Sequence, residues 1–242
     1  MLTPSLVWNH WLSSGHLELK ESAIPSLFEE GINPRLMVVT GENGGGKSLA
    51  IEIFRRISAD MATAEGSRLE VIDIGMKRRV AAGIERTMIF GHEATESTGN
   101  VSIRTALKGI ENSRTRDNDH WLVLDEPDIG VGDGYHEAIG QYLAAYGSNL
   151  PPLCSGLVVV SHSRAIVAEL LNAGASSLRV GPDLRPVWEW IARGDIRKSV
   201  DDLLALQDEV RSTKSRVTEL FNTLREEGRS AGQASVPRTI RV

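Results

Sequence analysis

The sequence predicts an α/β fold in which a mostly parallel sheet is covered by helices on both faces. Short, uninterrupted apolar runs alternate along the chain with amphipathic segments, as strands buried on both faces alternate with covering helices. One apolar run leads directly into a glycine-rich stretch, GENGGGKS, and then into a segment with helical spacing. With 242 residues, of which 41% are hydrophobic and 24% charged, the chain is long enough to bury a sizeable core.

The expected strands follow from apolar runs of four to eight residues. HLEL is short and alternating, whereas runs such as LMVV and WLVL are continuous and end in polar or glycine residues. In chain order, we expect strands over residues 16–19, 35–40, 69–74, 87–91, 120–128 and 156–162.

The expected helices follow from apolar residues at spacings of three and four. Gly147 and Gly174 stop two of them, and Gly31 stops a helical turn expected in IPSLFEEG over residues 24–31. In chain order, we expect helices over residues 4–13, 47–58, 101–113, 135–147 and 164–174.

The C-terminal part departs from this alternation. Residues 176–190 contain two short runs around Gly-Pro-Asp, which predicts an antiparallel hairpin. A long helix is expected from about 196 to 227, followed by a mobile Gly/Ser/Pro-bearing tail over 229–242. We therefore divide the chain into a main domain, residues 1–190, a C-terminal helix within 191–228, and the tail.

The C-terminal helix carries an apolar seam with alternating spacings of four and three. Gln207 and Lys214 interrupt it. Such a stripe packs either on the main domain or on another chain, and the sequence leaves both open; the polar interruptions lean slightly toward another chain. The seam consists of Ile196, Val200, Leu203, Gln207, Val210, Lys214, Val217, Phe221 and Leu224.

Composition narrows the class of protein. The formal net charge of −5 does not indicate nucleic-acid binding. Cys154 is the one cysteine, so the chain forms no internal disulfide and fits a reducing compartment. The longest apolar runs are far below the roughly 18 residues of a membrane span, and no signal peptide is apparent. We expect a cytoplasmic protein without membrane insertion.

The glycine-rich stretch matches the phosphate-binding pattern G-x-x-x-x-G-K-[ST]. In this pattern, backbone N–H groups surround phosphates, the lysine adds a positive charge, and the serine hydroxyl binds Mg²⁺. The next helix adds its positive N-terminal end. We therefore expect a bound nucleotide and Mg²⁺ as cofactors, with Lys47 as a catalytic residue and Ser48 as a metal ligand; the resemblance described below implies that the nucleotide is ATP. The expected nucleotide-binding residues are Gly41, Glu42, Asn43, Gly44, Gly45, Gly46, Lys47, Ser48 and Leu49.

A second pattern, WLVLDEPD, places two carboxylates at the end of an apolar strand. A carboxylate in that position, beside a phosphate loop, can hold Mg²⁺ directly or through water. Its neighbour in sequence faces another direction and can polarise an attacking water as a general base. We expect Asp125 to be a metal ligand and Glu126 to be the catalytic base.

Together these motifs resemble the ATP-binding-cassette (ABC) ATPases, and most closely the soluble branch with chromosome-maintenance and recombination-repair ATPases. GENGGGKS looks like their Walker A, LVLDEP like their Walker B with the catalytic glutamate, and VVVSHS places His162 like their switch histidine. The resemblance covers about residues 35–190. It implies a P-loop ATPase domain within residues 1–190 and a catalytic role for His162 at the γ-phosphate.

Other family features are matched less closely. ESTGN stands where the family signature LSGGQ is expected, with Ser97 and Gly99 matching. The resemblance implies that these two residues bind the nucleotide held by a second subunit. The glutamine of the family's Q-loop is missing, and His92 or Glu93 could replace it. An upstream aromatic often stacks on adenine in the family.

Two tryptophans are candidates for that stacking role. Trp8 and Trp11 lie on the expected amphipathic helix over residues 4–13. Two tryptophans on such a helix are more often core residues. Stacking by either one, or by neither, is left open.

The resemblance implies a soluble ATPase that forms an ATP-dependent homodimer around two composite sites and hydrolyses ATP. Since no effector motif is apparent, it implies regulation of a protein partner, in DNA maintenance or anti-phage defence by analogy. Two alternatives are an energising subunit of a membrane transporter and a scaffold that binds ATP without hydrolysis. The missing glutamine speaks against the first, and Glu126 against the second.

Overall fold

The computed structural model describes residues 1–14, 20, 21, 23–75 and 97–234. The strands expected over 16–19 and 87–91, and the candidates His92 and Glu93, lie outside these ranges. Within the last helix, the side chains of Gln207, Glu209, Val210 and residues 224–234 are also outside the description.

A six-stranded sheet forms the centre of the molecule, in the order β1-β6-β2-β5-β4-β3. All neighbouring strands are parallel except β1, which pairs antiparallel with β6. The predicted α/β class and mostly parallel sheet are thus confirmed. The strands are β1 (Ser26–Glu29), β2 (Asn33–Gly41), β3 (Glu70–Gly75), β4 (His120–Asp125), β5 (Cys154–Val160) and β6 (Ala175–Val180).

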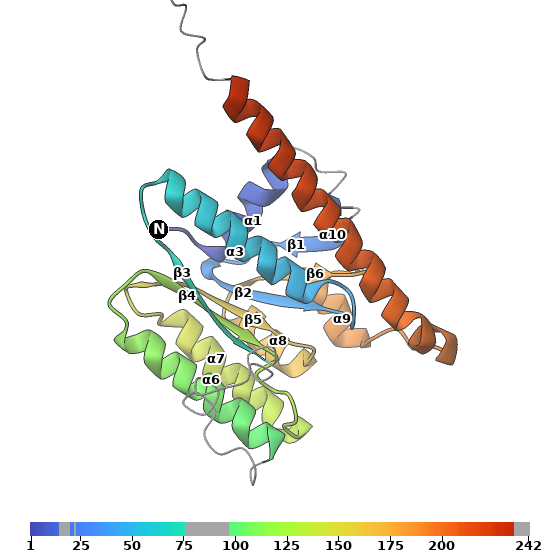
Figure 1. The fold of residues 1–242 in the computed structure, drawn as a ribbon. Helices are drawn as coiled ribbons and strands as arrows, with labels where there is room; N and C mark the ends of the chain where they lie inside the picture. Colours follow the sequence, from blue (N-terminus) through green and yellow to red (C-terminus); the bar gives the residue numbers. More distant parts are fainter. Residues whose placement is uncertain (15–19, 22, 76–96, 235–242) are drawn as a thin grey trace, which may run out of the picture.

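Helices cover both faces of this sheet, as predicted (Figure 1). On one face lie α1 (Pro4–Ser13), α3 (Lys47–Ala64) and part of α10 (Val200–Ala234). On the other lie α6 (Thr98–Thr115), α7 (His136–Ser148), α8 (Arg164–Asn172) and α9 (Val187–Arg193). A 3-10 turn, η2 (Asp133–Tyr135), precedes α7.

The alternation of side chains along each strand divides the core into two layers. In β2, Met37 and Val39 face α1 and α3, whereas Leu36 and Val38 face the opposite helices. These strand residues are fully buried, so the apolar runs are continuous because both faces are covered.

Two expected local structures are wrong. Residues 26–29, which were expected within a helical turn, form strand β1, whose backbone pairs with β6. The expected hairpin over 176–190 is instead β6 followed by helix α9. The antiparallel portion of the sheet therefore consists of β1 and β6, which are far apart in sequence, and not of a hairpin.

Helix α10 is longer than expected and packs in two different ways along its length. It continues through 229–234, which were expected to belong to the tail. Thr213, Val217 and Leu220 are buried against the sheet face that also carries α3. Val200 and Leu203, in its first turns, are 71% and 66% exposed. Of the seam residues in this part, Val217 and Phe221 thus pack on the main domain, and for them the lean toward another chain is wrong.

No helix among the described residues is long and apolar enough to cross a membrane.

Candidate functional site

The glycine-rich loop connects the carboxyl end of β2 to the N-terminus of α3, as predicted. Its glycines serve both backbone conformation and close packing. Gly41 has φ of 147°, and a Cβ there would lie 2.0 Å from the carbonyl oxygen of Val180. Gly46 precedes α3 with φ of 103°, in the left-handed region. Gly41 thus lets the loop lie against the end of β6, and Gly46 allows the left-handed turn into α3.

Lys47 folds back over the start of this loop. Its Nζ donates hydrogen bonds to the carbonyl oxygens of Gly41, at 3.0 Å, and Glu42, at 2.9 Å. Burial lowers the pKa of Lys47 to about 8, and the carboxylates of Glu126 and Asp125 are the strongest of the charges that oppose this shift. The loop lysine and the two carboxylates predicted to act with it therefore share one electrostatic environment.

The carboxylates lie where β4 ends. Asp125 is opposite Gly75 of β3 in the parallel register, and a Cβ on Gly75 would lie 2.5 Å from the Cβ of Asp125. Glu126 has φ of 53°, a left-handed conformation unusual for a residue with a side chain. Its N–H donates to the carbonyl oxygen of Val160 at 2.9 Å, which fixes the turn against the end of β5.

His162 meets Glu126 at this edge. Its Nε2 lies 3.3 Å from Glu126 Oε1, an ion-pair distance if the ring is protonated, without the alignment of a hydrogen bond. The His162 ring is the main cause that lowers the pKa of Glu126, so the carboxylate is ionised at neutral pH. The contact exists because β5, which ends just before His162, lies between β2 and β4 in the sheet.

The serines beside His162 hold the turn in place. Ser163 caps α8, with its side chain accepting a hydrogen bond from the N–H of Ile166. Ser161 accepts from the N–H of Ser163 at 2.9 Å and donates to Asp128 at 3.2 Å. Helix capping is thus performed by Ser163, and the imidazole of His162 is left to face Glu126.

Ser97 and Gly99 lie at the start of α6. Ser97 is exposed and its side chain accepts a hydrogen bond from the N–H of Asn100, so it caps the helix. Gly99 is buried, and a Cβ there would lie 2.4 Å from the carbonyl oxygen of Gly130. Their predicted role toward a second subunit stays a prediction, while both residues have a local structural role as well.

A cleft of about 280 Å³ beside the loop brings Asp195 and Lys198, which the sequence did not indicate, close to predicted site residues. Asp195, Ile196, Lys198 and the first turns of α10 form one wall, and Glu42, Asn43 and His162 form the other. Lys198 Nζ lies 2.7 Å from Glu42 Oε2. No sequence motif marks Asp195 or Lys198 as site residues, because the composition of their segment is like that of many helix starts.

Trp8 and Trp11 both lie in the core. They are 1% and 3% exposed, and the ring of Trp8 packs against Phe54 with centroids 5.0 Å apart. The Nζ of Lys20 lies 4.2 Å from the ring centroid of Trp11. The sequence left open whether either tryptophan stacks on adenine; in the structure, both are core residues.

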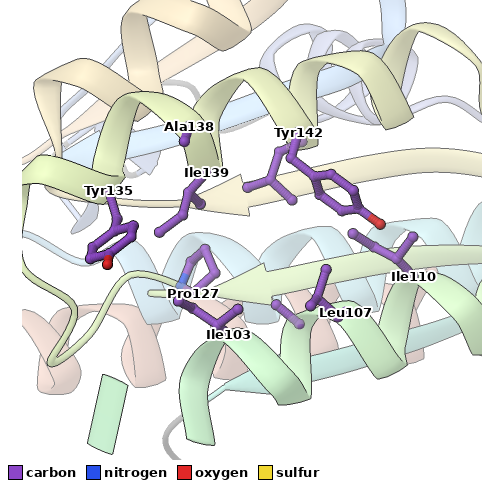
Figure 2. A pocket seen from close by; sticks show the side chains of 10 residues that line it. Ile103, Leu107, Ile110, Pro127, Tyr135, Ala138, Ile139 and Tyr142 are labelled. Carbon is purple, nitrogen blue, oxygen red and sulfur yellow. The ribbon is translucent and has the colours of Figure 1, made fainter. Parts of the chain in front are cut away.

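A separate cleft of about 180 Å³ lies between α6 and α7. Figure 2 shows Leu107 and Ile103 from α6 facing Ile139 and Tyr142 from α7, with Pro127 at the same cleft. Its lining is almost entirely apolar, so it offers no counter-charge for phosphates. This cleft therefore adds no residue to the candidate site at the loop, Asp125, Glu126 and His162.

The donors expected for a metal are limited to Ser48 and Asp125. Ser48 is exposed at the first turn of α3 and Asp125 is half-buried at the end of β4. Among the described residues, no group of three or more histidine, cysteine, aspartate or glutamate side chains is placed to hold a metal ion. A hydroxyl and one carboxylate suit Mg²⁺ when phosphate oxygens and water complete its coordination.

No protein-family model matches the chain, and the search of curated proteins found no match.

Proposed function

We propose that the chain is an ATP hydrolase of the ABC type, with the glycine-rich loop and Lys47 binding the phosphates and Glu126 acting as general base. The observation that carries the proposal is the convergence of three residues from distant parts of the sequence. Lys47, Glu126 and His162 meet at the carboxyl edge of three adjacent parallel strands. Ligands of open α/β sheets bind at this edge.

The charges at the edge fit hydrolysis of a phosphoanhydride. Lys47 supplies a buried positive charge, and the ionised carboxylate of Glu126 can accept a proton from water. The water oxygen then bonds to the terminal phosphorus while the bond to the leaving diphosphate oxygen breaks, giving ADP and phosphate. We assign to His162, which lies beside Glu126, the donation of a hydrogen bond to a terminal phosphate oxygen. Ser48 and Asp125 would hold Mg²⁺, whose charge offsets that of the phosphates.

The proposal extends to a homodimer that forms around ATP. Ser97 is exposed at the N-terminus of α6, so its hydroxyl and the adjoining backbone are accessible to the nucleotide of a second copy. Two such contacts related by a two-fold axis would close two sites at once. A protein partner that responds to the dimer is part of the same proposal.

Nucleotide binding by the wild type and two lysine variants tests the loop assignment. Lys47→Ala removes the buried ammonium and should abolish ATP binding in a calorimetric titration. Lys214→Ala removes an exposed ammonium from α10 and should bind like the wild type. Equal ATP affinity of Lys47→Ala and the wild type would contradict the assignment.

A further inference from the structure

The cleft between the glycine-rich loop and the C-terminal segment faces the reacting end of the bound nucleotide. This step depends on the proposed function: water attacks the terminal phosphorus, so the terminal phosphate must lie near Glu126. His162 lies 3.3 Å from Glu126 and also lines the cleft. Residues on the opposite wall, from Asp195 onward, therefore face the region where the terminal phosphate would lie.

Two buried polar atoms in this cleft lack hydrogen-bond partners among the described residues. They are Oε1 of Glu42 and Nε2 of His162. The other carboxylate oxygen of Glu42 is paired with Lys198 at 2.7 Å, and the Glu42 side chain is 14% exposed. A largely buried carboxylate with one oxygen lacking a hydrogen-bond partner, next to a phosphate loop, is stabilised there by its cation.

A terminal phosphate changes this balance of charge. It would place negative charge beside Glu42 and offer Lys198 an acceptor of higher charge than the carboxylate. ADP lacks this group and would leave the pair between Lys198 and Glu42 intact. The exchange therefore distinguishes the two nucleotides.

The segment that carries Lys198 is held mainly by polar contacts. Asp195 accepts a hydrogen bond from the indole of Trp190 at 2.7 Å, and Lys198 pairs with Glu42. Its apolar side chains contribute little, because Ile196, Val200 and Leu204 are 52%, 71% and 73% exposed. Farther along α10, Val217 and Leu220 are buried. A change at Lys198 can thus move the first turns of α10 while the second half stays anchored.

We propose that Lys198 senses the terminal phosphate, exchanging Glu42 for it when ATP binds and so coupling the state of the nucleotide to the first turns of α10. Lys198 is then the residue that gives the site its preference for ATP over ADP. The exposed apolar residues around it change position with the nucleotide.

The ratio of the ADP and ATP dissociation constants tests this proposal, measured by calorimetry in the Glu126→Gln background to prevent hydrolysis. Lys198→Ala should lower the preference for ATP by about tenfold, equivalent to about 1.4 kcal/mol, with little change for ADP. Lys198→Arg should retain most of the preference, since it keeps a cation. Lys214→Ala, which removes an exposed lysine from α10, is the matched control.

Glu42→Gln provides a second, independent variant. It removes the competing carboxylate, so the preference for ATP should rise. If Lys198→Ala increased the affinity for ATP and for ADP equally, the ion pair between Lys198 and Glu42 would only obstruct the site. The sensing role of Lys198 would then be wrong, while the proposed function would stand. An unchanged ratio of the ADP and ATP dissociation constants would likewise contradict the sensing role of Lys198 and leave the proposed function standing. Absence of binding of either nucleotide to the parent protein would overturn both proposals.

Discussion

Glu126 combines a strained backbone with the position where the chemistry is proposed. Among the described residues outside glycine, it is the one with positive φ, at 53°. Such a conformation costs about 1–2 kcal/mol for a residue with a Cβ. In this conformation, the turn directs the carboxylate of Glu126 toward His162.

This strain predicts a difference in stability between two variants of Glu126. Glu126→Gly should be more stable than Glu126→Ala by about 1 kcal/mol, since glycine adopts positive φ without strain. Both variants lack the carboxylate, so the comparison isolates the backbone. Urea denaturation measures the difference in the free energy of unfolding. Equal stability of the two variants would show that the turn is not strained.

The lowered pKa of Lys47 predicts how the affinity for nucleotide depends on pH. Burial lowers its pKa to about 8 in the free protein, and a bound phosphate chain favours the charged form. As the pH rises through about 8, the free protein loses the proton that binding requires, so affinity falls. At pH 9 only about a tenth of Lys47 is protonated, and ATP binding should be about tenfold weaker than at pH 7.

Lys47→Arg is the control for this titration, because a guanidinium stays charged throughout this range. Its ATP affinity, whatever its value at pH 7, should change little by pH 9 in the same calorimetric assay. A wild-type affinity that is constant from pH 7 to pH 9 would exclude Lys47 as the titrating phosphate contact.

Motifs located the loop and the carboxylates in sequence because each occupies a few consecutive residues. The contact of His162 with Glu126 depends on the strand order, which the sequence did not predict. The resemblance implied only a role for His162 at the γ-phosphate. Lys198 could not be predicted, since its approach to Glu42 depends on the turn after α9, where Gly194 has φ of 76°. Long-range placement of this kind leaves no local pattern.

At the scale of the elements, the two halves of α10 differ in what they contribute to stability. Val217→Ala and Leu220→Ala should each lower the free energy of unfolding by roughly 1–4 kcal/mol, because each opens a cavity in the core. Leu203→Ala and Leu204→Ala, at exposed positions of the same helix, should change it by less than about 0.5 kcal/mol. Chemical denaturation compares the two pairs.

The opposite result, stable core variants and unfolded surface variants, would mean that α10 packs through its first turns.

The two wrong local predictions share a physical cause. IPSLFEEG has spacing compatible with a helical turn, but pairing with the distant strand β6 makes residues 26–29 a strand. In the second case, VWEW alternates like a strand. Pro186 before it and Gly194 after it are the signals of a helix that the alternation concealed.

At the scale of the whole molecule, the proposed dimer requires that Ser97 contacts the ATP bound by a second copy. In a Glu126→Gln background, Ser97→Arg places a bulky cation at the exposed start of α6 and should prevent the ATP-dependent dimer while leaving binding by the monomer intact. Light scattering with and without Mg·ATP measures the mass. Thr115→Arg adds the same charge at the other, exposed end of α6 and should still dimerise.

A normal dimer of the Ser97→Arg variant would leave Ser97 with its capping role alone.

Hydrolysis itself is measured most directly by phosphate release from Mg·ATP, with the wild type and Glu126→Gln compared at equal ATP saturation. The variant keeps the shape of the side chain and removes the base. The account predicts steady release by the wild type and release slower by about 10²–10⁴-fold by the variant, which still binds ATP. Equal rates for the two proteins, or no release by a wild type that binds ATP, would contradict it.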